Sequence, residues 1–294
     1  MGLELKNVSK SYSGKKVVDN LNFSIEKPGV FGLLGSNGAG KTTTIRMMLG
    51  IINKDEGEIS WNGKPVKREN VNFGYLPEER GIYPKTLLFD QFMYFARLKG
   101  MKKDKAKVEI EYWAKKLGLE EYLHKPAEQL SKGNQQKVQL ILAILHKPDL
   151  LVLDEPFSGL DPVNTQIIKG IIEELISNNT YIVMSSHQMP VVEEYCRDIL
   201  LLNKGKTLLQ GNLEQIKNNY GSKNILIETA DDISKIIAKE KIIEQKVNSY
   251  EIAVSSEEMP KQFLKTLVDN NVNVKKFEIK TPSLHQIFID KVGE

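Results

Sequence analysis

The chain has 294 residues, enough for one large domain and a smaller one, and 40% of them are hydrophobic, which suffices for a proper core. Its 41 basic and 38 acidic residues give a net charge of +3, a balance that excludes a strong electrostatic footprint for DNA or RNA. One cysteine, Cys196, excludes an intramolecular disulfide framework. Because its neighbours are apolar, we expect a buried structural thiol.

Membrane insertion is not expected from the hydropathy pattern. The N-terminal residues lack the basic and apolar regions of a signal peptide. The longest apolar run, residues 140–145, is far below the roughly 20 residues that span a bilayer. We therefore expect a cytoplasmic protein whose membrane role, if any, depends on a partner chain.

The first third of the chain reads mainly as strands. Apolar residues cluster around turn signals at 13–14 and 27–29, and residues 30–34 form a short, fully apolar strand. A glycine-rich segment and helical spacing follow. The pattern predicts strands within 3–34 and at 57–61 and 73–76, and a helix at 43–49.

From about residue 87 to residue 146 the pattern changes to helical periodicity, which predicts a helical insertion with helices at 89–99, 105–117 and 135–146. Strand character returns at 150–153, 181–184 and 199–202, and residues 203–206 indicate a hairpin turn.

Past Gly211 a second pattern begins. It predicts strands at 224–228, 241–247, 250–254 and 272–279 and helices at 233–238, 259–268 and 284–292. The order β-α-β-β-α-β is typical of a split-βαβ, ferredoxin-like module. We expect a first domain over residues 1–213 and an accessory domain over 221–294, the latter without a catalytic constellation.

Residues 35–42, Gly-Ser-Asn-Gly-Ala-Gly-Lys-Thr, match G-x-x-x-x-G-K-[ST] between an apolar strand and a helix. Glycines let such a loop wrap around phosphate oxygens, so that backbone N–H groups at the helix start point inward. Lys41 would bridge the β- and γ-phosphates, and Thr42 would give its hydroxyl to Mg²⁺. The predicted contacts to ATP or GTP are Gly35, Ser36, Asn37, Gly38, Ala39, Gly40, Lys41, Thr42 and Thr43.

Residues 150–155 form an apolar strand that ends in two acids, Asp154 and Glu155. A carboxylate at the end of a parallel strand beside the phosphate loop can hold Mg²⁺, and the acid beside it can polarise the attacking water. We assign Asp154 to the metal and Glu155 to the general base. The alternative, a strand running into an acidic helix cap, is disfavoured by the accompanying phosphate loop.

Four further motifs follow in an order that resembles the ABC ATPases. Residues 130–134, Leu-Ser-Lys-Gly-Asn, resemble the LSGGQ signature, and residues 158–161 look like the loop after the acidic strand. His187 is similar to the switch histidine, and Tyr12 occupies the place of the aromatic residue that stacks on adenine. The resemblance covers residues 1 to about 213.

The resemblance implies an α/β fold, a P-loop NTPase core of the ABC ATPase type with an antiparallel β subdomain and a helical subdomain at about 87–146. A small C-terminal α+β, ferredoxin-like domain follows it. The implied activity is that of a Mg-dependent ATPase with ATP and Mg²⁺ as cofactors. Lys41, Glu155 and His187 are then the catalytic residues, and Thr42, Glu78 and Asp154 the metal ligands.

The resemblance also implies assembly. Two ATPase domains would meet head to tail, with Ser131 and the Gly133 backbone reaching the γ-phosphate of ATP held by the partner's Lys41. The chain would form a homodimer or a heterodimer with a homologue. It would power membrane-spanning permease subunits from the inner face of the cell membrane, with no nucleic acid as partner.

Three positions depart from the family pattern. Glu78 stands where the family usually has a glutamine, Lys132 replaces a glycine, and Asn134 replaces a glutamine. These variants bear on the turnover rate more than on the activity. With these variants the chain resembles bacterial exporter-type ATP-binding subunits that have an added C-terminal domain. The resemblance makes export the expected direction of transport.

Other interpretations stay open at this point. Ser131 could only cap a helix, His187 could be an ordinary loop residue, and Tyr12 a surface aromatic. The chain could instead be a soluble ABC ATPase acting on a ribosome or a nucleic-acid machine, or a nucleotide-gated regulatory subunit. It lacks the second cassette, the long coiled coil and the basic groove typical of the soluble class.

Overall fold

The computed structural model describes residues 2–67, 70–78, 81–220, 224–238, 240–256 and 258–293. The chain divides into two compact units, Met1–Gly211 and Asn212–Glu294. The first unit ends at Gly211, where residue 213 was expected. The expected start of the accessory domain, residue 221, lies outside the described residues, and the second unit already begins at Asn212.

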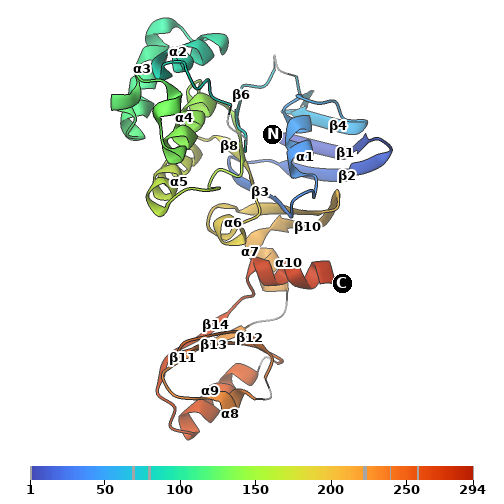
Figure 1. Cartoon of the computed structure of the whole chain (residues 1–294). Coiled ribbons are helices and arrows are strands. Elements are labelled where there is room, and N and C mark those ends of the chain that lie inside the picture. Colours follow the sequence, from blue (N-terminus) through green and yellow to red (C-terminus); the bar gives the residue numbers. More distant parts are fainter. Residues whose placement is uncertain are drawn as a thin grey trace. The chain divides into compact units, whose positions relative to one another are not determined.

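The chain up to the end of the first unit alternates strands and helices (Figure 1). Its elements are β1 (Leu3–Tyr12), β2 (Lys15–Ile25), β3 (Gly29–Gly35), α1 (Lys41–Met48), β4 (Glu56–Trp61), β5 (Lys64–Pro65), β6 (Phe73–Leu76), α2 (Leu88–Leu98), α3 (Lys103–Lys116), η1 (Glu120–Tyr122), η2 (Ala127–Gln129), α4 (Lys132–Ile144), β7 (Leu150–Asp154), α5 (Pro162–Ser177), β8 (Tyr181–Ser186), α6 (Met189–Tyr195), β9 (Asp198–Asn203) and β10 (Lys206–Asn212). Helices α5 and α6 occupy stretches to which the sequence pattern assigned no element.

The central sheet has the strand order β10-β9-β3-β8-β7-β6. β3 pairs in parallel with β8 and β9, and β7 pairs in parallel with β8 and β6. The carboxyl ends of these parallel strands therefore meet at one edge, the usual place for a ligand in an open α/β sheet. The loop after β3 and the acids after β7 share that edge.

The second sheet of this unit, β2-β1-β4-β5, is antiparallel. Successive side chains along a strand point to opposite faces of the sheet, and Leu3 and Leu5 of β1 point to the buried face. They belong to a core that also contains Ile45 of α1 and Phe31 of β3. The Phe31 ring stacks on Phe23 with 5.0 Å between ring centroids. This packing holds α1 against both sheets.

Helices α2, α3 and α4 form the predicted helical insertion. Phe92, Ile110 and Trp113 are buried in it, and α4 also packs against β6. Figure 1 separates these helices from the β1–β2–β4 sheet, with β6, β8 and β3 between them. No helix in the described ranges is long and apolar enough to cross a membrane.

Cys196, which ends α6, is buried as expected. Burial raises the pKa of its thiol to about 12, so the thiolate that reacts with oxidants or metals is suppressed. A Cβ at Gly32 of β3 would lie 3.0 Å from its sulfur, which shows how tightly the thiol packs on the central sheet.

The second unit contains α7 (Leu213–Asn219), β11 (Asn224–Thr229), α8 (Ser234–Ile237), β12 (Ile242–Lys246), β13 (Ser249–Ala253), α9 (Met259–Asp269), β14 (Val274–Lys280) and α10 (Leu284–Gly293). Its antiparallel sheet has the order β12-β13-β11-β14, the split-βαβ arrangement predicted from the sequence. Ile225 and Ile252 of the sheet pack against Ile237 of α8 and Phe263 of α9. The unit has its own core.

Candidate functional site

The glycine-rich loop joins β3 to α1 at the carboxyl edge of the central sheet. Gly38 and Gly40 have φ values of 78° and 107°, in the left-handed region that glycine enters without strain. A Cβ at Gly35 would lie 2.5 Å from the Leu202 carbonyl oxygen, so neighbouring strands also demand glycine there. The loop leads straight into the N-terminus of α1, where free N–H groups favour an anion.

Lys41, the first residue of α1, is buried and points back into the loop. Its Nζ donates to the carbonyl oxygens of Gly35 at 2.8 Å and Ser36 at 3.4 Å. It also lies 3.9 Å from Oε1 of Glu155. A buried ammonium is thus held at the loop, beside the acid predicted to be the general base.

Asp154 ends β7 and Glu155 follows it, and both carboxylates are buried. Glu155 has a φ of 51°, a left-handed conformation that costs free energy for a residue with a side chain and often marks a functional site. Its N–H donates to both the carbonyl oxygen and the Oγ of Ser185, each at 3.2 Å. Neighbouring β8 therefore fixes the strained residue.

His187 follows β8 and brings its ring to the same acid. Its Nδ1 lies 2.9 Å from Glu155 Oε1, while about half of its side chain is exposed. Glu155 Oε1 consequently has His187 on one side and Lys41 on the other. These three predicted catalytic residues form one cluster.

A cleft of about 350 Å³ opens over Lys41 and Glu155 of this cluster. It is lined by Val17, Ser36, Asn37, Gly38, Ala39, Gly40, Lys41, Thr42, Thr43, Glu78, Asp154 and Glu155. Thr42, Glu78 and Asp154 contribute one hydroxyl and two carboxylates, the hard oxygen donors that Mg²⁺ takes beside nucleotide phosphates. This donor set fits the predicted metal.

Four predicted binding residues, Gly35, Tyr12, Ser131 and Gly133, do not line this cleft, and neither does the catalytic candidate His187. Tyr12 lies at the end of β1 with 47% of its surface exposed, and Lys10 Nζ lies 5.5 Å from its ring centroid. Ser131 caps α4, accepting from the Asn134 N–H at 3.3 Å. Gly133 lies against Asn164 of α5, whose Nδ2 would be 2.6 Å from an added Cβ.

The structure adds residues to which the sequence reasoning gave no role. Ser185 Oγ donates to Asp154 Oδ1 and is fully buried. Burial and the charge of Asp154 raise the pKa of Tyr75 to about 12, against the opposing influence of Arg46. Val17 lines the cleft. Of these residues, only Ser185 had a signal in the sequence, since it belongs to the Ser-Ser-His run. Its bond to Asp154 could not be predicted, because it depends on β8 lying beside β7.

Comparison with known proteins gives matches along both units. The family model "ABC transporter" matches residues 18–158, and "ATP-binding protein DrrA1-3-like, C-terminal domain" matches residues 211–292. The chain is 46% identical over 294 residues to the uncharacterised ABC transporter ATP-binding protein YhaQ of Bacillus subtilis, covering 99% of this chain and 98% of that one.

Two further relatives extend the comparison. The linearmycin resistance ATP-binding protein LnrL of Bacillus subtilis is 27% identical over 305 residues, covering 99% of this chain and 98% of its own. A solved ATP-binding subunit of an ABC transporter superposes with a TM-score of 0.70 at 29% identity, covering 75% of this chain and 94% of that one. The predicted fold class is confirmed.

Proposed function

The chain belongs to the ABC transporter ATP-binding proteins, and from this membership we propose that it hydrolyses ATP in a magnesium-dependent reaction that powers a separate membrane-spanning partner. One observation carries the proposal. A buried lysine of the phosphate loop and a histidine both approach one carboxylate oxygen of a strained, buried glutamate, and the lysine and the glutamate line a single cleft.

Binding of the triphosphate follows from the loop. Backbone N–H groups of residues 36–43 surround the phosphates at the start of α1, and the Lys41 ammonium neutralises the charge on the β- and γ-oxygens. Thr42, Asp154 and Glu78 would hold Mg²⁺, which would supply further neutralisation of the phosphate charge. ATP thereby displaces Glu155 as the nearest anion to Lys41.

Hydrolysis needs a base and a group that orients it. Glu155 accepts the proton of the attacking water, and its position is set by the N–H bond to Ser185 and by His187 at 2.9 Å. The half-exposed His187 side chain would then stabilise the charge that develops on the γ-phosphate.

The test is a rate measurement on purified protein with Mg²⁺ and with EDTA. Turnover that requires Mg²⁺ and is lost in Lys41→Ala supports the proposal. Equal phosphate release with and without Mg²⁺, or full activity of Lys41→Ala, would contradict it.

We propose a head-to-tail dimer, because Ser131 and Gly133 lie away from their own chain's cleft. Mixing two inactive variants tests this arrangement. One chain carries Lys41→Ala and the other Ser131→Arg. In a mixed dimer of the two, one of the two ATP sites pairs the native Lys41 of one chain with the native Ser131 of the other. Mixing should therefore partly restore ATPase activity. No restoration in a mixture that demonstrably forms mixed dimers would argue that each chain works alone.

We further propose that the partner is a permease, that transport is export, and that the chain lies at the inner face of the membrane. The resistance function named for the relative LnrL supports export. Affinity purification from gently solubilised membranes tests the partner, and ribosomal proteins in place of a polytopic membrane protein would contradict it. Cells with Glu155→Gln should retain more of the exported compound.

A further inference from the structure

The phosphate loop is held in place by a hairpin distant in the chain. The turn between β9 and β10, residues 204 and 205, has φ values of 48° at Lys204 and 81° at Gly205, as in a tight two-residue hairpin turn. The Gly205 N–H donates to the Ala39 carbonyl oxygen at 3.0 Å. Ala39 lies between the two left-handed glycines of the loop and is buried.

The same turn is attached to β2 on its other side. The Asp19 N–H donates to the Gly205 carbonyl oxygen at 2.9 Å. A Cβ at Gly205 would lie 2.5 Å from the Val17 carbonyl oxygen, and a Cβ at Gly40 would lie 2.7 Å from that oxygen. Three backbones, those of the phosphate loop, β2 and the hairpin, therefore meet where only glycine fits.

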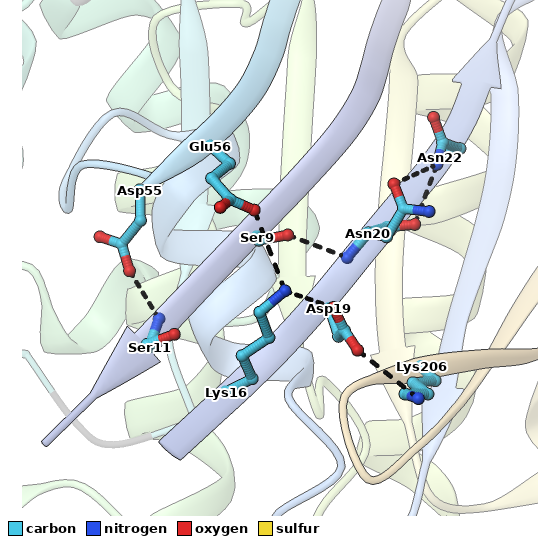
Figure 2. Close-up of polar contacts among 9 residues, drawn as sticks. All are labelled: Ser9, Ser11, Lys16, Asp19, Asn20, Asn22, Asp55, Glu56 and Lys206. Carbon is cyan, nitrogen blue, oxygen red and sulfur yellow. Dashed lines mark hydrogen bonds and ion pairs between the residues drawn. The ribbon is translucent and has the colours of Figure 1, made fainter. Parts of the chain in front are cut away.

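Side chains reinforce this junction from the solvent side. Figure 2 shows Asp19 of β2 facing Lys206 of the hairpin, and Lys16 reaching both Asp19 and Glu56. The Asp19 carboxylate lies 3.6 Å from Lys206 Nζ and 2.8 Å from Lys16 Nζ. Lys16 lies 3.9 Å from Glu56 at the start of β4. The charges thus tie the hairpin to the antiparallel sheet.

We propose that Gly205 is a positioning residue for ATP binding, and that the Asp19–Lys206 ion pair supports it. By binding the carbonyl of Ala39, the hairpin keeps the loop from turning that peptide, so the N–H groups of residues 38–42 stay directed into the cleft. A backbone hydrogen bond lost from a buried site changes an equilibrium by about tenfold. The inference rests on the proposed function for the identity of the ligand.

The chain contains a matched control for this glycine. Asn62 and Gly63, between β4 and β5, form a turn with φ values of 51° and 77°, nearly those of the β9–β10 turn. A Cβ at Gly63 meets nothing within 4 Å. Gly63→Ala therefore carries the same conformational strain as Gly205→Ala without touching the phosphate loop.

The experiment compares Gly205→Ala and Gly63→Ala in the full chain. Amide hydrogen exchange, measured without nucleotide, should rise about tenfold at Ala39 and Thr44, whose N–H groups donate to the carbonyl oxygens of Ser36 and Gly40, in Gly205→Ala only. The Kd for ATP should rise about tenfold in the same variant, with unchanged circular dichroism. Folded Gly205→Ala with native exchange in the loop and a native Kd would overturn the proposal.

Two further arms keep the outcome decisive. If Gly205→Ala does not fold, the variant with both Asp19→Ala and Lys206→Met decides, with Lys246→Met, which breaks the exposed pair with Glu244, as control. Raised exchange at Ala39 and Thr44 in the double variant, but not in Lys246→Met, supports the positioning role of the hairpin, and unchanged exchange refutes it. If neither the native chain nor any variant binds ATP, the proposed function fails. The exchange result still shows whether the hairpin positions the loop.

Discussion

In the proposed mechanism the reaction depends on Glu155, whose carboxylate is buried and lies 2.9 Å from His187 Nδ1 and whose backbone is strained. Glu155→Gln keeps the shape but cannot accept a proton. We expect it to abolish turnover, to retain ATP binding and to form an ATP-dependent dimer. Phosphate release and light scattering with ATP check this, and native turnover would remove Glu155 from the role of base.

Ser185 supports the carboxylate of Asp154, the proposed metal ligand. Its hydroxyl donates to Asp154 Oδ1 and accepts from the Glu155 N–H, and all three groups are buried. Ser185→Ala leaves a buried carboxylate oxygen without this donor, which should lower the free energy of unfolding by about 1–3 kcal/mol. Denaturant unfolding measures the loss.

The neighbouring serine provides the comparison. Ser186 is also buried, but its Oγ accepts from the Gln188 N–H rather than binding a carboxylate. Ser186→Ala should therefore destabilise less than Ser185→Ala. The reverse order would show that the bond to Asp154 is not the dominant one at the end of β8.

At the scale of elements, His146 joins the end of α4 to β6. Its Nε2 lies 3.0 Å from the Phe73 carbonyl oxygen. Burial, assisted by the charge of Lys99, lowers the pKa of His146 to about 4 from its ordinary 6.5. Below 6.5 the unfolded chain binds a proton that the folded chain refuses, so stability from this group falls as the pH drops from about 6.5 to about 4.

The size of this effect is on the order of 3 kcal/mol, because each pH unit between the two pKa values, 6.5 and about 4, contributes about 1.36 kcal/mol. His146→Gln should flatten the dependence of the unfolding free energy on pH between 4 and 6.5. His124, which is exposed, provides the control variant His124→Gln. An equal slope in His146→Gln and the native protein would show that other groups govern acid unfolding.

For the whole molecule, the separate cores of the two units predict that the first folds alone. The central-sheet unit ends at Gly211, and the second unit has its own buried cluster. A chain ended at Gly211 should keep native affinity for ATP, because every residue of the cleft precedes that point. Calorimetric titration checks this, and loss of binding would show that the second unit completes the fold.

Much of the architecture could be predicted because it is encoded locally. The apolar strand before Gly35 and the helical spacing after Lys41 placed the phosphate loop, and alternation of strands and helices past Gly211 predicted the ferredoxin-like unit. Helix α5, by contrast, was not assigned, although Asp161 caps it and Pro162 begins it. Those turn signals were interpreted only as a loop.

The positions of the proposed phosphate loop and acidic pair can be found from the residues alone, since Gly35–Thr42 and Asp154–Glu155 are contiguous runs with recognisable patterns. The groups that hydrogen-bond to these runs from other strands depend on the fold. Ser185 reaches Asp154 because β8 lies beside β7, and Gly205 reaches Ala39 because the β9–β10 turn lies against the phosphate loop. Those contacts join residues far apart in the chain, and no local periodicity records strand order.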